Sequence, residues 1–138
     1  MYYASELIPA KFLVLVAHFT ICVLLLWNSP QSVKACLTQE ASEEVFRIHH
    51  TQLVVGLSVS VGMICFELFI FLIGLTMFHP TSALLSIGCH ASACFLLSYI
   101  VLDGWQCGWF WWIFTFGSVV PILNDSCILV DIIINKKY

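Results

Sequence analysis

Four long runs of hydrophobic residues dominate the chain and are separated by short polar connections. The runs cover residues 8–27, 53–78, 82–102 and 110–134. Each is close to, or longer than, the roughly 20 residues that a helix needs to cross a membrane. A buried strand of a soluble protein is usually only about 4 to 8 residues long, which argues against strands here. The pattern predicts an all-α fold, a four-span transmembrane helix bundle formed by residues 1–138 as a single domain.

The connections between the runs differ in length. The first, 28–52, is the one sizeable segment outside the membrane and has room for a short surface helix. The second, 79–82, has the features of a tight hairpin, because Pro80 cannot continue the preceding helix. We therefore expect the second and third spans to be antiparallel neighbours. The third connection, 103–108, leads into a row of tryptophans that suits the membrane surface.

The composition of the chain narrows the class of protein further. Hydrophobic residues make up 61% of the sequence and charged residues 9%, values far from those of a soluble domain. The 5 basic residues form no cluster along the sequence and the net charge is -3, so nucleic acid is not an expected partner. The lipid bilayer is the partner that this composition requires.

An even number of spans places both ends of the chain on the same side of the membrane. Lys11, Lys136 and Lys137 lie toward these ends, whereas Lys34 and Arg47 lie in the first connection. Because positive residues near the spans favour the cytoplasmic side, this small difference predicts that both termini are cytoplasmic.

Four ionisable residues lie well inside the hydrophobic runs: His18, Glu67, His90 and Asp125. A rise of about 1.5 Å per residue places all of them at a similar depth, so they are candidates for one polar layer. Charged groups inside a membrane are costly and should face the bundle and pair, as Glu67 and His90 can do across the hairpin.

Two interpretations of this layer stay open. We favour a hydrogen-bonded latch between helices, because no further acid or histidine is spaced to complete a metal site or a nucleophile set. The alternative is a small intramembrane transporter or enzyme that uses Glu67, His90 and Asp125. The sequence contains no recognisable catalytic motif, and we expect neither an enzymatic activity nor a cofactor. The adjacent histidines His49 and His50 point about 100° apart on a helix, so they do not form a metal site together.

Two of the 7 cysteines, Cys36 and Cys107, lie in the first and third connections, on the same side of the membrane. In an oxidising compartment a disulfide between them would join the two halves of the bundle. The sequence leaves open whether this bond forms. The other cysteines lie within the runs, where a thiol is most often an inert packing group.

Small residues mark surfaces on which helices can approach each other closely. Small-xxx-small spacings occur at Ser58 and Gly62 and at Gly88 and Ser92, and Ser86 lies on the same run as the second pair. We expect these residues at helix–helix contacts, either within the chain or with another subunit.

Short motifs in a characteristic order run through the chain from about Ser5 to Lys137. They include Leu7-Ile8-Pro9-Ala10-Lys11, Ala17-His18, Ala35-Cys36-Leu37, Gln52-Leu53-Val54, Ser86-Ile87-Gly88-Cys89-His90, Trp105-Gln106-Cys107 and Lys136-Lys137. In the order of these motifs and in its loop lengths, the chain resembles the transmembrane protein 107 family, small four-span proteins of the cilium.

This resemblance implies a role that composition and spacing do not address. Members of the family are non-enzymatic components of the ciliary transition zone, where complexes of the Meckel-syndrome type form a membrane diffusion barrier. The resemblance therefore implies a membrane scaffold subunit that supports ciliogenesis and controls the protein composition of the ciliary membrane. The partners that it implies are tectonics, other small multispan membrane proteins and B9-domain proteins.

Overall fold

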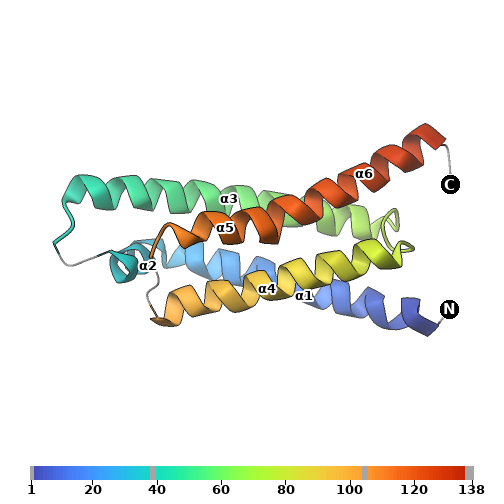
Figure 1. Cartoon of the computed structure of the whole chain (residues 1–138), viewed down its shortest axis with the longest axis horizontal. Helices are drawn as coiled ribbons and strands as arrows, with labels where there is room; N and C mark the ends of the chain where they lie inside the picture. Colours follow the sequence, from blue (N-terminus) through green and yellow to red (C-terminus); the bar gives the residue numbers. More distant parts are fainter. Residues whose placement is uncertain (1, 38–39, 104–105, 136–138) are drawn as a thin grey trace.

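The computed structural model describes residues 2–37, 40–103 and 106–135, with side chains from Ser5 onward. In these residues all regular structure is helical, and four helical stretches are long and apolar enough to cross a membrane. The stretches run side by side as a bundle (Figure 1). The first and last helices start and finish at one end of it, the terminal end, and α2 lies at the other, the α2 end (Figure 1). The all-α four-span architecture expected from the sequence is confirmed.

The helical segments follow the hydrophobic runs, and the fourth span contains a π-helix, η1. In chain order the segments are α1 (Tyr2–Trp27), α2 (Ser29–Cys36), α3 (Glu43–Leu72), α4 (Pro80–Asp103), α5 (Trp109–Phe114), η1 (Thr115–Val119) and α6 (Val120–Asn135). Helix α2 occupies the first connection and has Pro30 in its first turn, where proline costs no hydrogen bond. The fourth span is formed by α5, η1 and α6 in direct succession.

Helix α3 differs most from its expected limits of 53–78. It begins earlier, at Glu43, because Ser42 caps its first turn by accepting a hydrogen bond from the backbone N–H of Val45 at 3.4 Å. The acidic side chain of Glu43 at this end also suits the positive end of the helix dipole. The polar residues after position 42 therefore extend the helix beyond the hydrophobic run.

The same helix also ends earlier than expected, at Leu72, because the chain reverses its local handedness at Gly74. Gly74 has a φ of 90°, which a residue without Cβ adopts at little cost. Its N–H donates to the carbonyl of Phe71, and the N–H of Leu75 donates to the carbonyl of Ile70, which is the Schellman pattern of a helix end. Residues 73–79 therefore form an irregular connection in place of the tight hairpin expected at 79–82.

The spans are not arranged in the order of the chain. Helix α1 packs against α3 and α4, and the segments of the fourth span also pack against α3 and α4. Among the described residues, α3 and α4 have no close backbone contact with each other, so they lie diagonally opposite, as do α1 and α6. The expectation that the second and third spans are neighbours is wrong, because the connection 73–79 is long enough to cross the end of the bundle.

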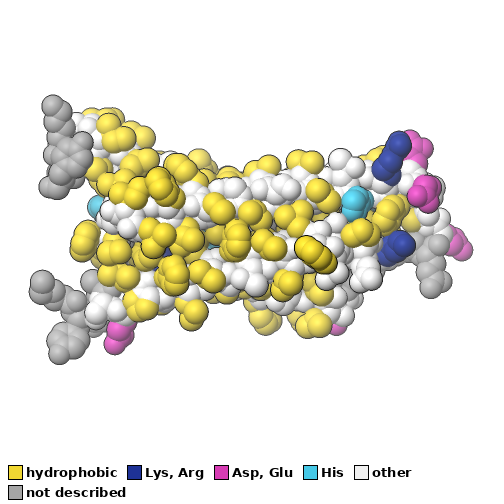
Figure 2. Space-filling view, turned by 180° about the vertical axis from the view of Figure 1, so that it is seen from behind, with side chains coloured by type: hydrophobic (Ala, Val, Ile, Leu, Met, Phe, Trp, Pro, Cys, Tyr) yellow, Lys and Arg dark blue, Asp and Glu magenta, His cyan; other side chains and the backbone are white. Residues whose placement is uncertain are grey.

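The core changes character along the bundle axis. Toward the α2 end the core is mainly hydrophobic; the hydrophobic cluster, which reaches past His18 to Leu15 on α1, consists of Leu15, Cys22, Leu25, Leu57, Ile64, Ala93, Leu97, Phe110 and Ile113. Toward the terminal end it is polar and contains the buried residues Lys11, His18, Glu67, Ser82, Ser86, His90 and Asp125. The outer surface shows a different distribution. Hydrophobic side chains cover most of the face in Figure 2, and charged side chains lie mainly near its two ends. Lipid around the middle of the bundle accounts for this distribution.

Candidate functional site

Lys11 lies at the centre of the polar half of the core. Its side chain is 1% exposed, and its ammonium donates a hydrogen bond to Oδ2 of Asp125 at 3.0 Å. The same nitrogen lies 3.5 Å from Oε1 of Glu67. The sequence analysis counted Lys11 as a charge near the end of the chain, and its position in the core corrects that interpretation. Two carboxylates buried in a membrane need a cation nearby, and Lys11 supplies it.

Asp125 accepts hydrogen bonds on both of its carboxylate oxygens. Oδ2 receives the Lys11 ammonium, and Oδ1 receives the hydroxyl of Ser82 at 2.7 Å. The side-chain amide of Asn124 donates to the Ser82 oxygen at 2.7 Å and lies 3.4 Å from Oδ1 of Asp125. The carboxylate is therefore held by side chains from α1, α4 and its own helix, α6.

Glu67 reaches from α3 across the bundle to the diagonally opposite helix α4. Its Oε1 accepts the hydroxyl of Ser86 at 2.5 Å, and its Oε2 lies 2.8 Å from Nε2 of His90. Because the α3 and α4 backbones do not touch, these side chains carry the contact between the two helices. Lys11 and Asp125 bridge the other diagonal, and the contact from Lys11 to Glu67 joins the two bridges.

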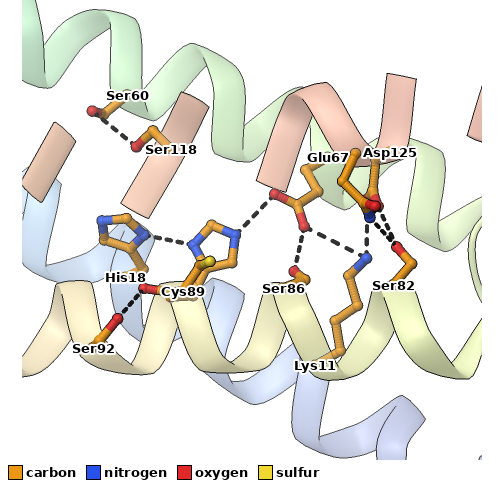
Figure 3. Close-up of polar contacts among 12 residues, drawn as sticks. Lys11, His18, Ser60, Glu67, Ser82, Ser86, Cys89, Ser92, Ser118 and Asp125 are labelled. Atoms are coloured by element: carbon orange, nitrogen blue, oxygen red, sulfur yellow. Dashed lines mark hydrogen bonds and ion pairs between the residues drawn. The ribbon is translucent and has the colours of Figure 1, made fainter. Parts of the chain in front are cut away.

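His18 extends the network toward the hydrophobic half of the core. Its Nδ1 lies 2.7 Å from Nδ1 of His90, and the two rings are tilted by 56° with their centroids 5.0 Å apart. These contacts form a continuous path from His18 through His90, Glu67 and Lys11 to Asp125, and Figure 3 labels His18, Glu67, Lys11 and Asp125 along it. We call these five residues the core cluster. None of them is more than 2% exposed.

The structure thus brings together all four ionisable residues that the sequence analysis selected. They form a path along the bundle axis rather than a single layer, because they take part in two diagonal bridges at different depths. Each charged group of the core cluster contacts an opposite charge or a hydrogen-bond donor from another helix. Contacts of this kind between helices are what the latch interpretation requires.

Cys36 and Cys107 are joined by a disulfide, with their Cα atoms 5.5 Å apart. The bond connects the last residue of α2 to the segment just before α5, at the end of the bundle opposite the termini. A small cavity of about 30 Å³ lies beside it and is lined partly by His49 and Gln52. The disulfide closes a loop that contains α3 and α4.

Of the small residues expected at helix contacts, only Ser86 faces the core, where it bonds Glu67. The other four lie on the exposed faces of α3 and α4: Ser58, Gly62, Gly88 and Ser92. The expectation that they form helix contacts within the chain is therefore wrong. A Cβ atom added to Gly62 or Gly88 would meet nothing within 4 Å. The spacing of small residues cannot reveal which face of a helix is buried when both faces are apolar.

The close approaches occur at two other glycines. A Cβ atom at Gly56 of α3 would lie 2.5 Å from the ring of Phe110, and one at Gly117 of η1 would lie 2.5 Å from the Cβ of Ala93. The Cβ position of Gly117 is also 3.4 Å from Cε1 of His18. The sequence does contain a signal for an irregular turn at Gly117. Pro121 follows four residues later, and a proline commonly distorts the helical turn that precedes it.

The chain is similar in sequence to known proteins of one family. The model of the transmembrane protein 107 family (TMEM107) matches residues 7–129, which include every residue of the core cluster and both bridged cysteines. No solved structure matches the chain.

Individual relatives cover nearly the whole chain. It is 37% identical to transmembrane protein 107 of Xenopus laevis over 93% of this chain and 91% of the relative. The identity is also 37% to the protein of that name in Homo sapiens, over 96% of this chain and 95% of the relative. The identity to the protein of that name in Danio rerio is 39%, over 92% of this chain and 94% of the relative. With the match to the family model, these identities establish that the four-span bundle belongs to the transmembrane protein 107 family.

Proposed function

We propose that this protein is a non-enzymatic membrane scaffold subunit of the ciliary transition zone. In this role it supports ciliogenesis and controls the protein composition of the ciliary membrane by recruiting or retaining other transition-zone proteins. Membership of the family supports the proposal. The structural observation that carries it is that the residues of the core cluster pair with one another in the interior of the bundle, where each is at most 2% exposed. A site that turns over a substrate needs access, whereas a scaffold needs a fixed shape.

The surfaces that remain for recognition are the outer faces of the spans and the short connections. Exposed Trp109 and Trp112 and the hydrophobic side chains around them form much of the surface near the α2 end of the fourth span. We propose tectonics and other small multispan proteins as partners within the membrane, and B9-domain proteins as partners outside it. Each would recognise a surface of fixed shape, which is what the latch in the core provides.

Both termini are proposed to be cytoplasmic. The Cys36–Cys107 disulfide supports this orientation, because such bonds persist in oxidising compartments and are rare in the cytosol. It lies at the end of the bundle away from the termini. Lys136 and Lys137, which entered the charge count, lie outside the described residues. An epitope at either terminus should be stained at the cilium only after the plasma membrane is permeabilised, and staining in intact cells would reverse the orientation.

The test of the proposed function is localisation combined with rescue. A tagged copy is expressed in ciliated cells depleted of the endogenous protein and is imaged against axoneme and basal-body markers. The expected result is a narrow band at the base of the cilium, with restored retention of ciliary membrane proteins. Diffuse signal in the secretory pathway or plasma membrane, without rescue, would contradict the proposal.

One observation favours a second candidate, a small intramembrane transporter or enzyme. Glu67, His90 and Asp125 do lie in one connected network with Lys11. The Glu67→Gln and Asp125→Asn variants separate the candidates when their disulfide and expression level match the unaltered protein. A scaffold with these substitutions should still localise and support cilia, whereas a proton-coupled transporter should be present but inactive.

A further inference from the structure

The charges of the core cluster do not balance when both histidines are neutral. Lys11 contributes one positive charge, whereas Glu67 and Asp125 contribute one negative charge each, which leaves a net charge of -1. The described charged residues on the surface, such as Glu6 and Arg47, are exposed and lie outside this core. An uncompensated charge is costly in the interior of a membrane protein. One additional proton on the cluster would remove it.

The hydrogen bonds show where that proton can be held. The contact between Nε2 of His90 and Oε2 of Glu67 needs one proton, and so does the contact between the Nδ1 atoms of His18 and His90. If His90 is an imidazolium, it donates in both contacts, and His18 accepts as a neutral ring with its own proton on Nε2. If His90 is neutral and Glu67 is ionised, the one proton of His90 is on Nε2, so His18 must donate through Nδ1, and Nε2 of His18 carries no proton.

The groups around the histidine pair favour the charged form of His90. From α3, Glu67 accepts the His90 bond while Ser86 and Lys11 contact its other oxygen, which holds Glu67 as an anion. Asp125 adds a second negative charge from α6 on the far side of Lys11. The titratable neighbours from α1 and α4 besides Lys11 and the histidines are thiols, such as Cys22 and Cys89, and these are neutral.

The fourth span packs against the other side of His18 through η1. Gly117 approaches Cε1 of His18, the ring carbon between its two nitrogens. Pro121, four residues later, has no backbone N–H to donate to the Gly117 carbonyl, as an α-helix would require. The backbone of η1 therefore lies close to the ring of His18.

We infer that the core cluster is a proton-binding site, in which His90 holds one exchangeable proton between Glu67 and His18 and makes the buried cluster electrically neutral. Binding takes one proton from water and forms one N–H bond in the histidine pair, and nothing is oxidised or reduced. On release, the proton on Nε2 of His18 leaves to water. The proton between the two Nδ1 atoms then moves from His90 to His18, so both rings are neutral and His90 keeps its proton on Nε2. The inference concerns the charge of the core and holds whether or not the protein is a transition-zone scaffold.

The test uses the full chain with ¹⁵N-labelled histidine in phosphatidylcholine nanodiscs and reads the ring nitrogens by NMR as pH is varied. His90 is assigned by the loss of its signals in the His90→Asn variant, and the exposed His79 is the internal reference. At the pH where half of His79 is neutral, both ring nitrogens of His90 are expected to carry protons in most molecules. A His90 with one bare nitrogen under these conditions would overturn the inference.

Charge-matched variants make the test specific. In Glu67→Gln or Asp125→Asn the remaining carboxylate balances Lys11, so His90 is expected to lose its extra proton at the same pH. Glu6→Gln, which removes an exposed carboxylate from the same end of the bundle, should leave His90 unchanged. If either folded core variant keeps the extra proton, the inference is wrong. If neither variant folds, the unaltered protein alone decides the matter.

Thermal unfolding gives a second readout. A proton bound by the folded protein stabilises it at low pH, and this contribution is lost as pH rises and the proton leaves. The melting temperature of the unaltered protein should therefore fall across the pH range in which NMR reports deprotonation of His90. The Glu67→Gln variant should lack that fall. Parallel pH curves for the two proteins would contradict the inference.

Discussion

The ammonium of Lys11 lies 3.0 Å from the carboxylate of Asp125, although α1 and α6 occupy diagonally opposite corners of the bundle. The long lysine side chain makes this possible, because it can cross the centre of the bundle between α3 and α4. The pair therefore contacts all four spans, directly or through Glu67 and Ser82. Its loss is expected to affect the packing of the whole terminal half.

Replacing Lys11 with Met tests the importance of this cation. The Lys11→Met variant keeps a side chain of similar length but leaves two buried carboxylates without their ammonium. The free energy of unfolding is expected to fall by about 3–5 kcal/mol, the usual cost of removing one partner of a buried ion pair. The measurement is reversible unfolding of the purified protein in mixed micelles with increasing denaturing detergent.

A double variant supplies the control for this experiment. In Lys11→Met/Asp125→Asn one negative charge is removed together with the positive one, so much of the lost stability should return. If the double variant is as unstable as the sum of the two single variants, the ion pair does not account for the loss. The comparison is a double-mutant cycle on residues in direct contact.

Gly117→Ala should destabilise the contact between the fourth span and α4. The added Cβ would lie 2.5 Å from the Cβ of Ala93, which is fixed to its backbone and cannot turn aside. Overpacking of this kind typically costs about 1–3 kcal/mol. Gly88→Ala is the matched control, because its Cβ would meet nothing within 4 Å. Equal melting temperatures for the two variants would contradict the close packing at η1.

Gly74→Ala should loosen the end of α3. A φ of 90° is unfavourable for alanine, and the left-handed conformation costs about 1–2 kcal/mol for a residue with a Cβ atom. Gly108→Ala is the control, because Gly108 has a φ of -65° and space around it. Hydrogen exchange of the amides of Gly74's neighbours, Ile73 and Leu75, should become faster in Gly74→Ala alone. Unchanged exchange there would argue against the Schellman end.

Removing the disulfide should lower the stability of the α2 end. The bond joins residues that are 71 positions apart, and loss of a cross-link of this size usually costs about 2–5 kcal/mol. Cys36→Ser and Cys107→Ser should reduce the melting temperature by the same amount, and the double variant by no more than either single one. Cys65→Ser, at an exposed free cysteine, serves as the control. A different mobility with and without reductant on a gel verifies the bond in the unaltered protein.

The sequence predicts the type of fold because hydrophobic runs of this length have few alternatives. It also identifies the buried acids and histidines, since such residues are costly in a membrane and must face the bundle. The end of α3 was misjudged because hydrophobicity continues through residues 73–78, although Gly74 provides a stop signal that hydropathy does not register. Lys11 was missed because a lysine near the end of a span usually reaches the membrane surface.

The arrangement of the spans was the hardest property to predict. A short connection usually joins neighbours, so the diagonal relation of α3 and α4 follows only from the position of Gly74 and the longer connection that it creates. The face of each span that is buried in the bundle was also difficult to predict. Both faces of these helices are apolar, because the outer face contacts lipid and not water. The ionisable residues selected from the middle of the spans were the better guide, since His18, Glu67, His90 and Asp125 all lie on buried faces.

The 114 positions that separate Lys11 from Asp125 also bear on how the protein is made. Lys11 belongs to the first of the four spans and Asp125 to the fourth, so the lysine is synthesised well before the carboxylate to which it donates. At about 5–20 residues per second the delay is roughly 6 to 23 s. Glu67 on α3 is synthesised earlier than Asp125 and is the first carboxylate partner that Lys11 can meet. The contacts of α1 are therefore complete only after the fourth span has been made.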